Sequence, residues 1–178
     1  MSQIFTSRMI KAAILGANDG IITTFAVVAG VVGAKLPVHI ILILGIANMI
    51  ADGISMSVGD YLGERSAAQH EKSTGQEKSS ETLWHSSAVT FVAFIVAGIL
   101  PLAPYILRFV GVPIAESWQF TLSIISTGVA LFLVGSLGTL VTKGNWLKSG
   151  LEMLGIGAIA AVVAYGLGAL IEQIISSQ

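Results

Sequence analysis

Long apolar segments alternate with short polar ones along the whole chain. Five of the apolar segments are each long enough to cross a hydrocarbon core about 30 Å thick at about 1.5 Å of helical rise per residue. We predict membrane-spanning helices at about residues 12–33, 38–62, 86–107, 118–141 and 150–172. The pattern therefore predicts an all-α integral membrane protein with five transmembrane helices, in a single transmembrane domain over residues 1–178.

The connections between these segments are short, with one exception. Gly33 and Pro37 bracket the first connection, where Gly typically ends one helix and Pro starts the next, so the first two spans are expected to form an antiparallel hairpin. The only sizeable polar segment is residues 63–85. We expect it to be a short cytoplasmic connector that continues the second helix and then returns along the membrane surface.

Composition supports a lipid environment. Apolar residues make up 54% of the chain and charged residues 11%, the mean hydropathy is +0.85, and soluble proteins carry about 25% charged residues. There is no cysteine, which excludes disulfides, thiolate metal sites and cysteine nucleophiles. The net charge is −1 and the charges are scattered, so no nucleic-acid partner is expected.

The distribution of basic residues predicts the orientation. Two of the nine Lys and Arg residues, Lys35 and Arg108, fall on one side of the predicted spans, and the other seven fall on the side of the N-terminus. By the positive-inside rule, the N-terminus and the connector are cytoplasmic and the C-terminus is outside. No small-residue cleavage site follows the first apolar stretch convincingly, so we interpret it as a retained first helix.

Three aspartates lie within or at the end of the predicted spans. Asp19 is inside the first span, Asp52 is inside the second, and Asp60 is near the cytoplasmic end of the second. A carboxylate at membrane depth costs about 2.5 kcal/mol or more, so such residues are rare and functional by default. The alternative is a neutral, hydrogen-bonded structural aspartate, or, for Asp60, one solvated at the interface.

Spacing along the second span sharpens this observation. Asn48, Asp52, Met56 and Asp60 recur every four residues and so share one face of a helix. Helical rise places Asp19 about 11 Å from the cytoplasmic end of its span, level with Met56 at about 9 Å, and Thr23 follows Asp19 by one turn. Carboxylate oxygens with a thioether sulfur favour a divalent ion of borderline softness, such as iron(II), cobalt or zinc. Alone, Met56 would be interpreted as a packing residue.

Two segments carry a family resemblance. They are residues 16–30 (GANDGIITTFAVVAG) and 44–61 (LGIANMIADGISMSVGDY), and the likeness continues at 131–135 (LFLVG) and 149–157 (SGLEMLGIG). In these motifs the chain resembles the vacuolar iron transporter family. The resemblance implies a five-helix homodimer that moves Fe2+ or Mn2+ out of the cytosol in exchange for protons, along a pathway between subunits. It places the family's pathway aspartate on Asp19 and its pathway methionine on Met56.

The chain departs from the family in one respect. Longer members insert a glutamate-rich cytoplasmic metal-binding domain between the second and third spans, whereas residues 63–85 are too few for one. A smaller metal-collecting site could use residues of the connector: Glu64, His70, Glu71, Glu77, Glu81 and His85. A solvated amphipathic connector is the favoured alternative.

Other functions fit the sequence less well. An intramembrane aspartyl protease needs a Gly-x-Gly-Asp context, and residues 57–60 lack the first glycine, so we do not expect an enzyme. A proton-coupled exporter of organic cations is the main alternative, although such sites usually add aromatic walls. We expect a metal/proton exchanger with Fe2+ as cargo and Mn2+, Co2+ or Zn2+ as further candidates. Its partners are a second copy and lipid, it holds no permanent cofactor, and a plasma membrane is expected.

Overall fold

Five long helices form the structure. The computed structural model describes residues 2–73 and 81–177, without the side chains of 2–6, 71–73, 81–83, 141 and 142. The helices are α1 (Ser2–Gly33), α2 (Val38–Ser73), α3 (Glu81–Phe109), α4 (Glu116–Thr142) and α5 (Trp146–Ser176). Each is long and apolar enough to cross a membrane, and the described residues contain no strand. The prediction of an all-α protein with five membrane-spanning helices is confirmed.

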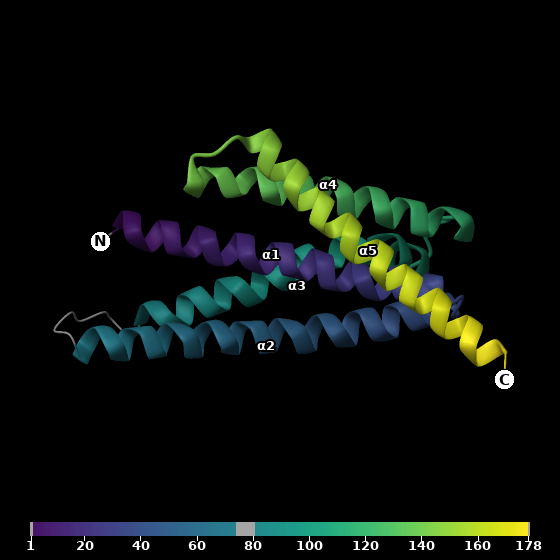
Figure 1. Cartoon of the computed structure of the whole chain (residues 1–178), viewed down its shortest axis with the longest axis horizontal. Coiled ribbons are helices and arrows are strands. Elements are labelled where there is room, and N and C mark those ends of the chain that lie inside the picture. Colours follow the sequence, from purple (N-terminus) through teal and green to yellow (C-terminus); the bar gives the residue numbers. More distant parts are fainter. Residues whose placement is uncertain (1, 74–80, 178) are drawn as a thin grey trace.

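The helices extend beyond the predicted spans at the end of the molecule that carries the N-terminus. The first helix begins at Ser2 and the second continues to Ser73, so much of the expected connector is helical. Residues 74–80 lie outside the described residues. We call the end with the start of α1 the proximal end and the opposite one, with the C-terminus, the distal end (Figure 1).

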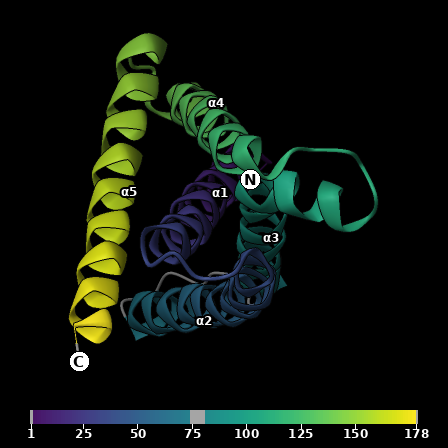
Figure 2. The same cartoon turned by 90° about the vertical axis from the view of Figure 1, so that its right-hand side faces the viewer.

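The first helix occupies the centre of the bundle. It contacts all four other helices, and the end-on view shows α2, α3, α4 and α5 arranged around it (Figure 2). Helix α5 contacts only α1 and α4 within the described parts of the chain. It crosses them diagonally and leaves most of its apolar surface exposed (Figure 1). A central α1 means that its side chains can meet residues from any other span.

Close packing of α1 on α3 depends on glycine. A Cβ atom at Gly16 would overlap the backbone carbonyl of Thr90, and one at Gly20 would overlap that of Phe94. The two backbones therefore touch where α1 has no side chain. Helices in membranes associate through such small residues because lipid supplies no hydrophobic drive between them.

Two prolines lie inside α3, at positions 101 and 104. Pro104 has no N–H, so the carbonyl of Leu100 loses its helical donor. The hydroxyl of Ser126 on α4 donates to that carbonyl at 3.0 Å, and the hydroxyl of Ser123 donates to the carbonyl of Pro101 at 2.6 Å. The hydroxyl of Ser126 on the neighbouring helix thus satisfies the backbone carbonyl that Pro104 would leave open in lipid.

The helix connections follow their turn chemistry. After Gly33 the chain turns through Lys35, which has a positive φ of 53°, and α2 begins directly after Pro37. The side chain of Asn145 caps α5 by accepting from the backbone N–H groups of Leu147 and Lys148. The first two spans form the predicted antiparallel hairpin.

Candidate metal pathway

Helix α2 presents four longitudinal ridges, each made of residues spaced by four. The packed ridge is buried and consists of Ile41, Gly45, Met49 and Gly53. The polar ridge is half-buried and consists of Asn48, Asp52, Met56 and Asp60. The small-residue ridge is exposed and consists of Ala47, Ala51, Ser55, Gly59 and Gly63. The large apolar ridge is exposed and consists of Ile46, Ile50, Ile54, Val58 and Leu62.

The order of these ridges places the polar one at a boundary. Adjacent i±4 rows on a helix differ by one residue number, so the polar ridge lies between the packed ridge and the small-residue ridge. Its side chains therefore flank the protein interior on one side and an open surface on the other. Bulky residues facing lipid are ordinary in a membrane helix, whereas an exposed row of small residues is suited to close approach by another helix.

Asp52 is the best-defined carboxylate of the polar ridge. Its Oδ2 accepts a hydrogen bond from Nδ2 of Asn48 at 2.7 Å, one helical turn away. Its charge also lies close enough to that of Asp19 on α1 for the two carboxylates to repel each other. The structure thus brings together Asp19 and Asp52 from the two arms of the first hairpin. Two neighbouring carboxylates concentrate negative charge, which attracts a cation.

On α1, Asp19 and Thr23 lie half-buried on a side that also carries the exposed Leu15. The hydroxyl of Thr23 donates to the backbone carbonyl of Asp19 at 2.8 Å, as threonine commonly does within helices. Its hydrogen is thereby engaged, and its oxygen can serve only as an acceptor or a ligand. Met56 lies half-buried on α2 one turn from Asp52. That Met56 lies level with Asp19 stays a prediction.

The carboxylate of Asp60 has different neighbours from that of Asp52. Its Oδ2 lies 3.4 Å from the hydroxyls of Ser87 and Thr90 on α3. Both hydroxyl groups are buried, and neither was singled out from the sequence. The signal was present, since three hydroxyl residues (Ser86, Ser87 and Thr90) open an otherwise apolar span. The carboxylate of Asp60 therefore points to the α2–α3 contact at the proximal end.

At the proximal end, one predicted collecting residue, Glu64, forms an ion pair. Arg8 Nη2 on α1 lies 2.7 Å from Glu64 Oε2 on α2. Of the other predicted collecting residues, His70 is exposed on the last turns of α2, and the side chains of Glu71 and Glu81 lie outside the described residues. The whole of Glu77 lies outside them as well. The carboxylate of Glu64 is thus paired with the guanidinium of Arg8 from the same chain.

The described residues of one copy do not assemble a complete acidic metal site. Within the described residues, no group of three His, Cys, Asp or Glu side chains gathers closely enough to hold a metal ion. What one copy offers is the Asp19–Asp52 pair, the amide of Asn48 and the thioether of Met56, at the margin of the exposed small-residue ridge. Such a set needs further ligands from water or from another copy.

Comparison with known proteins agrees with the motifs. The model of the VIT family matches residues 10–83 and 73–169. The chain is 30% identical to vacuolar iron transporter homolog 3 of Arabidopsis thaliana over 175 residues, covering 93% of this chain and 84% of that protein. It is 29% identical to vacuolar iron transporter homolog 1 of the same plant over 175 residues, with the same two coverages.

A third relative is longer within the aligned region. The chain is 27% identical to the vacuolar iron transporter of Toxoplasma gondii over 234 positions, covering 97% of this chain and 77% of that protein. The alignment exceeds the 178 residues of this chain, so the relative carries additional residues inside it. These relatives are named after vacuolar transporters, which lends no support to our expectation of a plasma membrane. Family match, coverage and five spans agree, and the chain belongs to the VIT family of multi-pass membrane proteins.

Proposed function

We propose that the chain is a divalent metal ion transporter that moves Fe2+ out of the cytosol in exchange for protons, with Mn2+, Co2+ and Zn2+ as further candidate cargoes. The N-terminus is cytosolic in this proposal, as the seven basic residues of the proximal side favour. The observation that carries the proposal is the proximity of Asp19 on α1 to Asp52 on the polar ridge of α2, inside the membrane-spanning region.

The chemistry of these side chains suits the proposed cargo. Carboxylates and the amide oxygen of Asn48 are hard ligands, whereas the thioether of Met56 is soft, and the combination favours divalent ions of borderline softness. Relatives named as iron transporters support iron among these ions and transport over catalysis. Rings are absent from the polar ridge, so the aromatic walls that an organic cation would use are not part of it.

A second copy completes the site in this proposal. The small-residue ridge allows another helix to approach α2 closely. A Cβ atom added at Gly59 or Gly63 would meet no atom of a neighbouring helix within 4 Å, so the space beside these glycines is open. A two-fold partner on this ridge would enclose the adjacent polar ridge between two subunits. It would also duplicate Asp19, Asp52 and Met56 around one axis. The pathway then lies between the subunits, and neither copy needs a complete site of its own.

Proton exchange follows from the ligand chemistry. A carboxylate must be deprotonated to bind a metal ion, so metal binding releases protons and protonation releases metal. Asp19 and Asp52 are near each other and half-buried, so full charge on both is least costly when a cation lies between them. A pH gradient can therefore drive the metal in the opposite direction.

The test is Fe2+ flux into proteoliposomes under a pH gradient. We expect proton-coupled flux in the wild type and a loss of at least tenfold in Asp19→Asn, which keeps the volume but removes the charge. Met56→Leu should also lower the flux. The matched control is Met49→Leu, a methionine of the buried packed ridge on the same helix, where a volume-conserving change costs little.

Two results would contradict the proposal. Equal Fe2+ flux in Met56→Leu and Met49→Leu would show that the thioether of Met56 is not a metal ligand in the pathway. A folded wild-type protein that carries none of iron, manganese, cobalt and zinc would refute metal transport and favour export of organic cations.

A further inference from the structure

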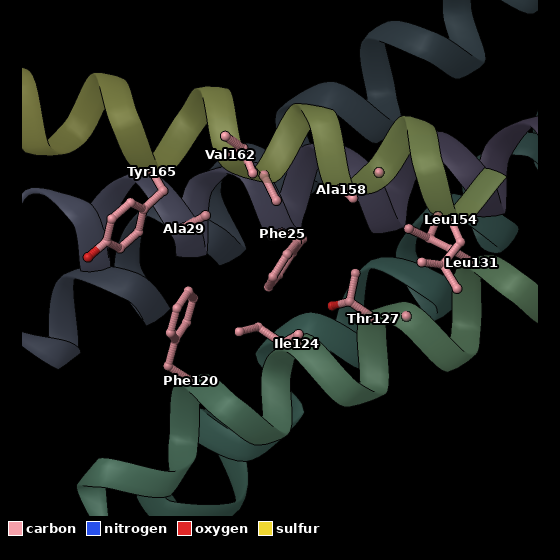
Figure 3. Close-up of a pocket in the computed structure, with 13 residues that line it drawn as sticks. Phe25, Ala29, Phe120, Ile124, Thr127, Leu131, Leu154, Ala158, Val162 and Tyr165 are labelled. Carbon is pink, nitrogen blue, oxygen red and sulfur yellow. The ribbon is translucent and has the colours of Figure 1, made fainter. Parts of the chain in front are cut away.

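A large apolar cavity lies between α1, α4 and α5, away from the polar ridge of α2. Its volume is about 430 Å³, within the range of sites for small molecules. Phe25 of α1, Phe120 of α4 and Tyr165 of α5 contribute aromatic walls (Figure 3). The Phe25 and Phe120 rings have centroids 6.3 Å apart and are nearly parallel, at 16°. Phe120 and Tyr165 are also 6.3 Å apart, at 22°.

The cavity results from the path of α5. Near its start α5 packs tightly on α4, where a Cβ atom at Gly135 would lie 2.7 Å from the carbonyl oxygen of Ser149. Near its end it packs on α1, where a Cβ atom at Gly168 would overlap the carbonyl of Gly30. Between these two glycine crossings α5 passes from one neighbour to the other. The three helices separate there, and the space opens toward lipid beside the exposed Ile124 and Val162.

One polar group in the cavity wall has no partner. Thr127 of α4 is 2% exposed, and its hydroxyl makes no hydrogen bond. The usual acceptor for a helical threonine is the carbonyl four residues earlier, which here belongs to Ser123, and the hydroxyl of Thr127 makes no bond to it. Figure 3 shows the oxygen of Thr127 on the cavity side of α4. A buried hydroxyl without a partner is costly, so this one calls for an acceptor on whatever fills the cavity.

Depth restricts the occupant. Thr127 lies eleven residues after Glu116, the first residue of α4, which is about 17 Å along the helix and near the middle of a core about 30 Å thick. The ester carbonyls of a phospholipid stay near the headgroups, far from this level. A helix of another subunit is about 10 Å thick and would not enter a cavity of about 430 Å³. The remaining match is a slim neutral molecule that carries a carbonyl into the bilayer centre.

We propose that this cavity binds a lipophilic carbonyl-bearing ring of the membrane quinone type, with its tail in the lipid opening. The flat ring packs against the aromatic walls, and one ring carbonyl accepts the hydrogen bond from Thr127. Phe25 and Ala29 form the floor on α1, so the ligand contacts the helix that also carries Asp19. The site shares no residue with the candidate metal ligands. The proposal of a quinone site therefore does not depend on which ion is transported.

The test uses a benzoquinone with a ten-carbon tail as the probe, added to the purified full chain in lipid nanodiscs. Binding is measured by equilibrium titration and by the rise in thermal unfolding temperature. A benzene ring with the same tail is the carbonyl-free comparison. Thr127→Val keeps the shape and removes the donor, so we expect binding of the quinone to weaken about three- to tenfold, with no change for the carbonyl-free probe.

A second pair of variants tests the location. Gly128 lines the cavity, and a Cβ atom there meets nothing within 4 Å, so Gly128→Leu can fill the space without a backbone clash. Gly155 of α5 is equally open but does not line the cavity, which makes Gly155→Leu the control. We expect quinone binding to be lost in Gly128→Leu and kept in Gly155→Leu. Ala158→Leu fills the same cavity from α5 and serves if Gly128→Leu does not fold.

The proposal is overturned if the wild type does not bind the quinone, or if both probes bind equally well. It is also overturned if the wild type, Thr127→Val and the folded cavity-filling variants bind the quinone alike.

Discussion

Asn48 controls how the carboxylate of Asp52 is presented. Its amide donates to Oδ2 at 2.7 Å, a short bond of the strength typical for an ionised acceptor. The amide is neutral, so it orients the carboxylate and leaves its negative charge in place. A lysine or arginine in the same position would neutralise that charge. One oxygen is held and the charge remains for a cation. On the polar ridge, Asn48 is therefore a positioning residue as well as a candidate ligand.

Replacing Asn48 should weaken metal uptake without abolishing it. Asn48→Ala removes the donor that holds Asp52, and we expect the KM for Fe2+ to rise about three- to tenfold at little changed kcat. Asn48→Gln retains an amide and should recover part of the loss. Flux at graded Fe2+ concentrations in proteoliposomes measures both. An unchanged KM in Asn48→Ala would show that the hydrogen bond has no role in binding.

The residue scale is also where sequence reasoning reached its limit. Spacing by four placed Asp52 and Asp60 on one ridge because helical geometry alone decides that. It could not show that Asp52 approaches Asp19 while Asp60 lies beside Ser87 and Thr90, because those contacts depend on how α1 and α3 pack on α2. The ion pair between Arg8 and Glu64 was missed for the same reason.

At the scale of elements, hydropathy predicted five helices because the hydrocarbon core demands about twenty apolar residues per span. It did not predict that α1 begins as early as Ser2, whereas the continuation of α2 to Ser73 through polar residues agrees with the expectation that the connector continues the second helix. Hydropathy also does not show what the glycines within the helices contact. The structure divides them into those at backbone contacts, such as Gly16 and Gly20, and those facing open space, such as Gly155 and Gly166.

This division predicts opposite effects for the same substitution. Gly20→Ala would place a methyl group against the backbone carbonyl of Phe94, which cannot yield as a side chain can, so α1 and α3 must separate. We expect a loss of stability of about 2 kcal/mol. Gly155→Ala meets nothing within 4 Å and should stabilise α5 by about 0.5–1 kcal/mol, because alanine is the better helix former. Reversible unfolding in mixed micelles, followed by tryptophan fluorescence, measures both, and equal effects would contradict the α1–α3 packing.

At the scale of the whole molecule, the described chain has two unusual exposed surfaces. One is α5, which contacts only α1 and α4 and exposes large apolar side chains suited to lipid. The other is the small-residue ridge of α2, which borders the polar ridge. Lipid contact accounts for the first surface, since bulky apolar residues need no partner in a bilayer. It does not account for a continuous row of Ala, Ser and Gly beside three acid or amide side chains, which is why our proposal places a second copy on α2.

The subunit contact can be tested by cross-linking because the chain has no cysteine. In a two-fold dimer packed through the small-residue ridge, equivalent positions near the axis approach within the 7 Å between Cα atoms that a disulfide requires. We expect Ala51→Cys or Ser55→Cys to give a covalent dimer on mild oxidation in the membrane. Val58→Cys on the large apolar ridge of the same helix, and Gly166→Cys on α5, are exposed controls that should stay monomeric. In parallel, Ala51→Leu should separate the subunits and abolish Fe2+ flux, because the polar ridge would then face lipid instead of its counterpart. Cross-linking through Gly166→Cys but not through the small-residue ridge would move the contact to α5 and leave the polar ridge outside the subunit interface.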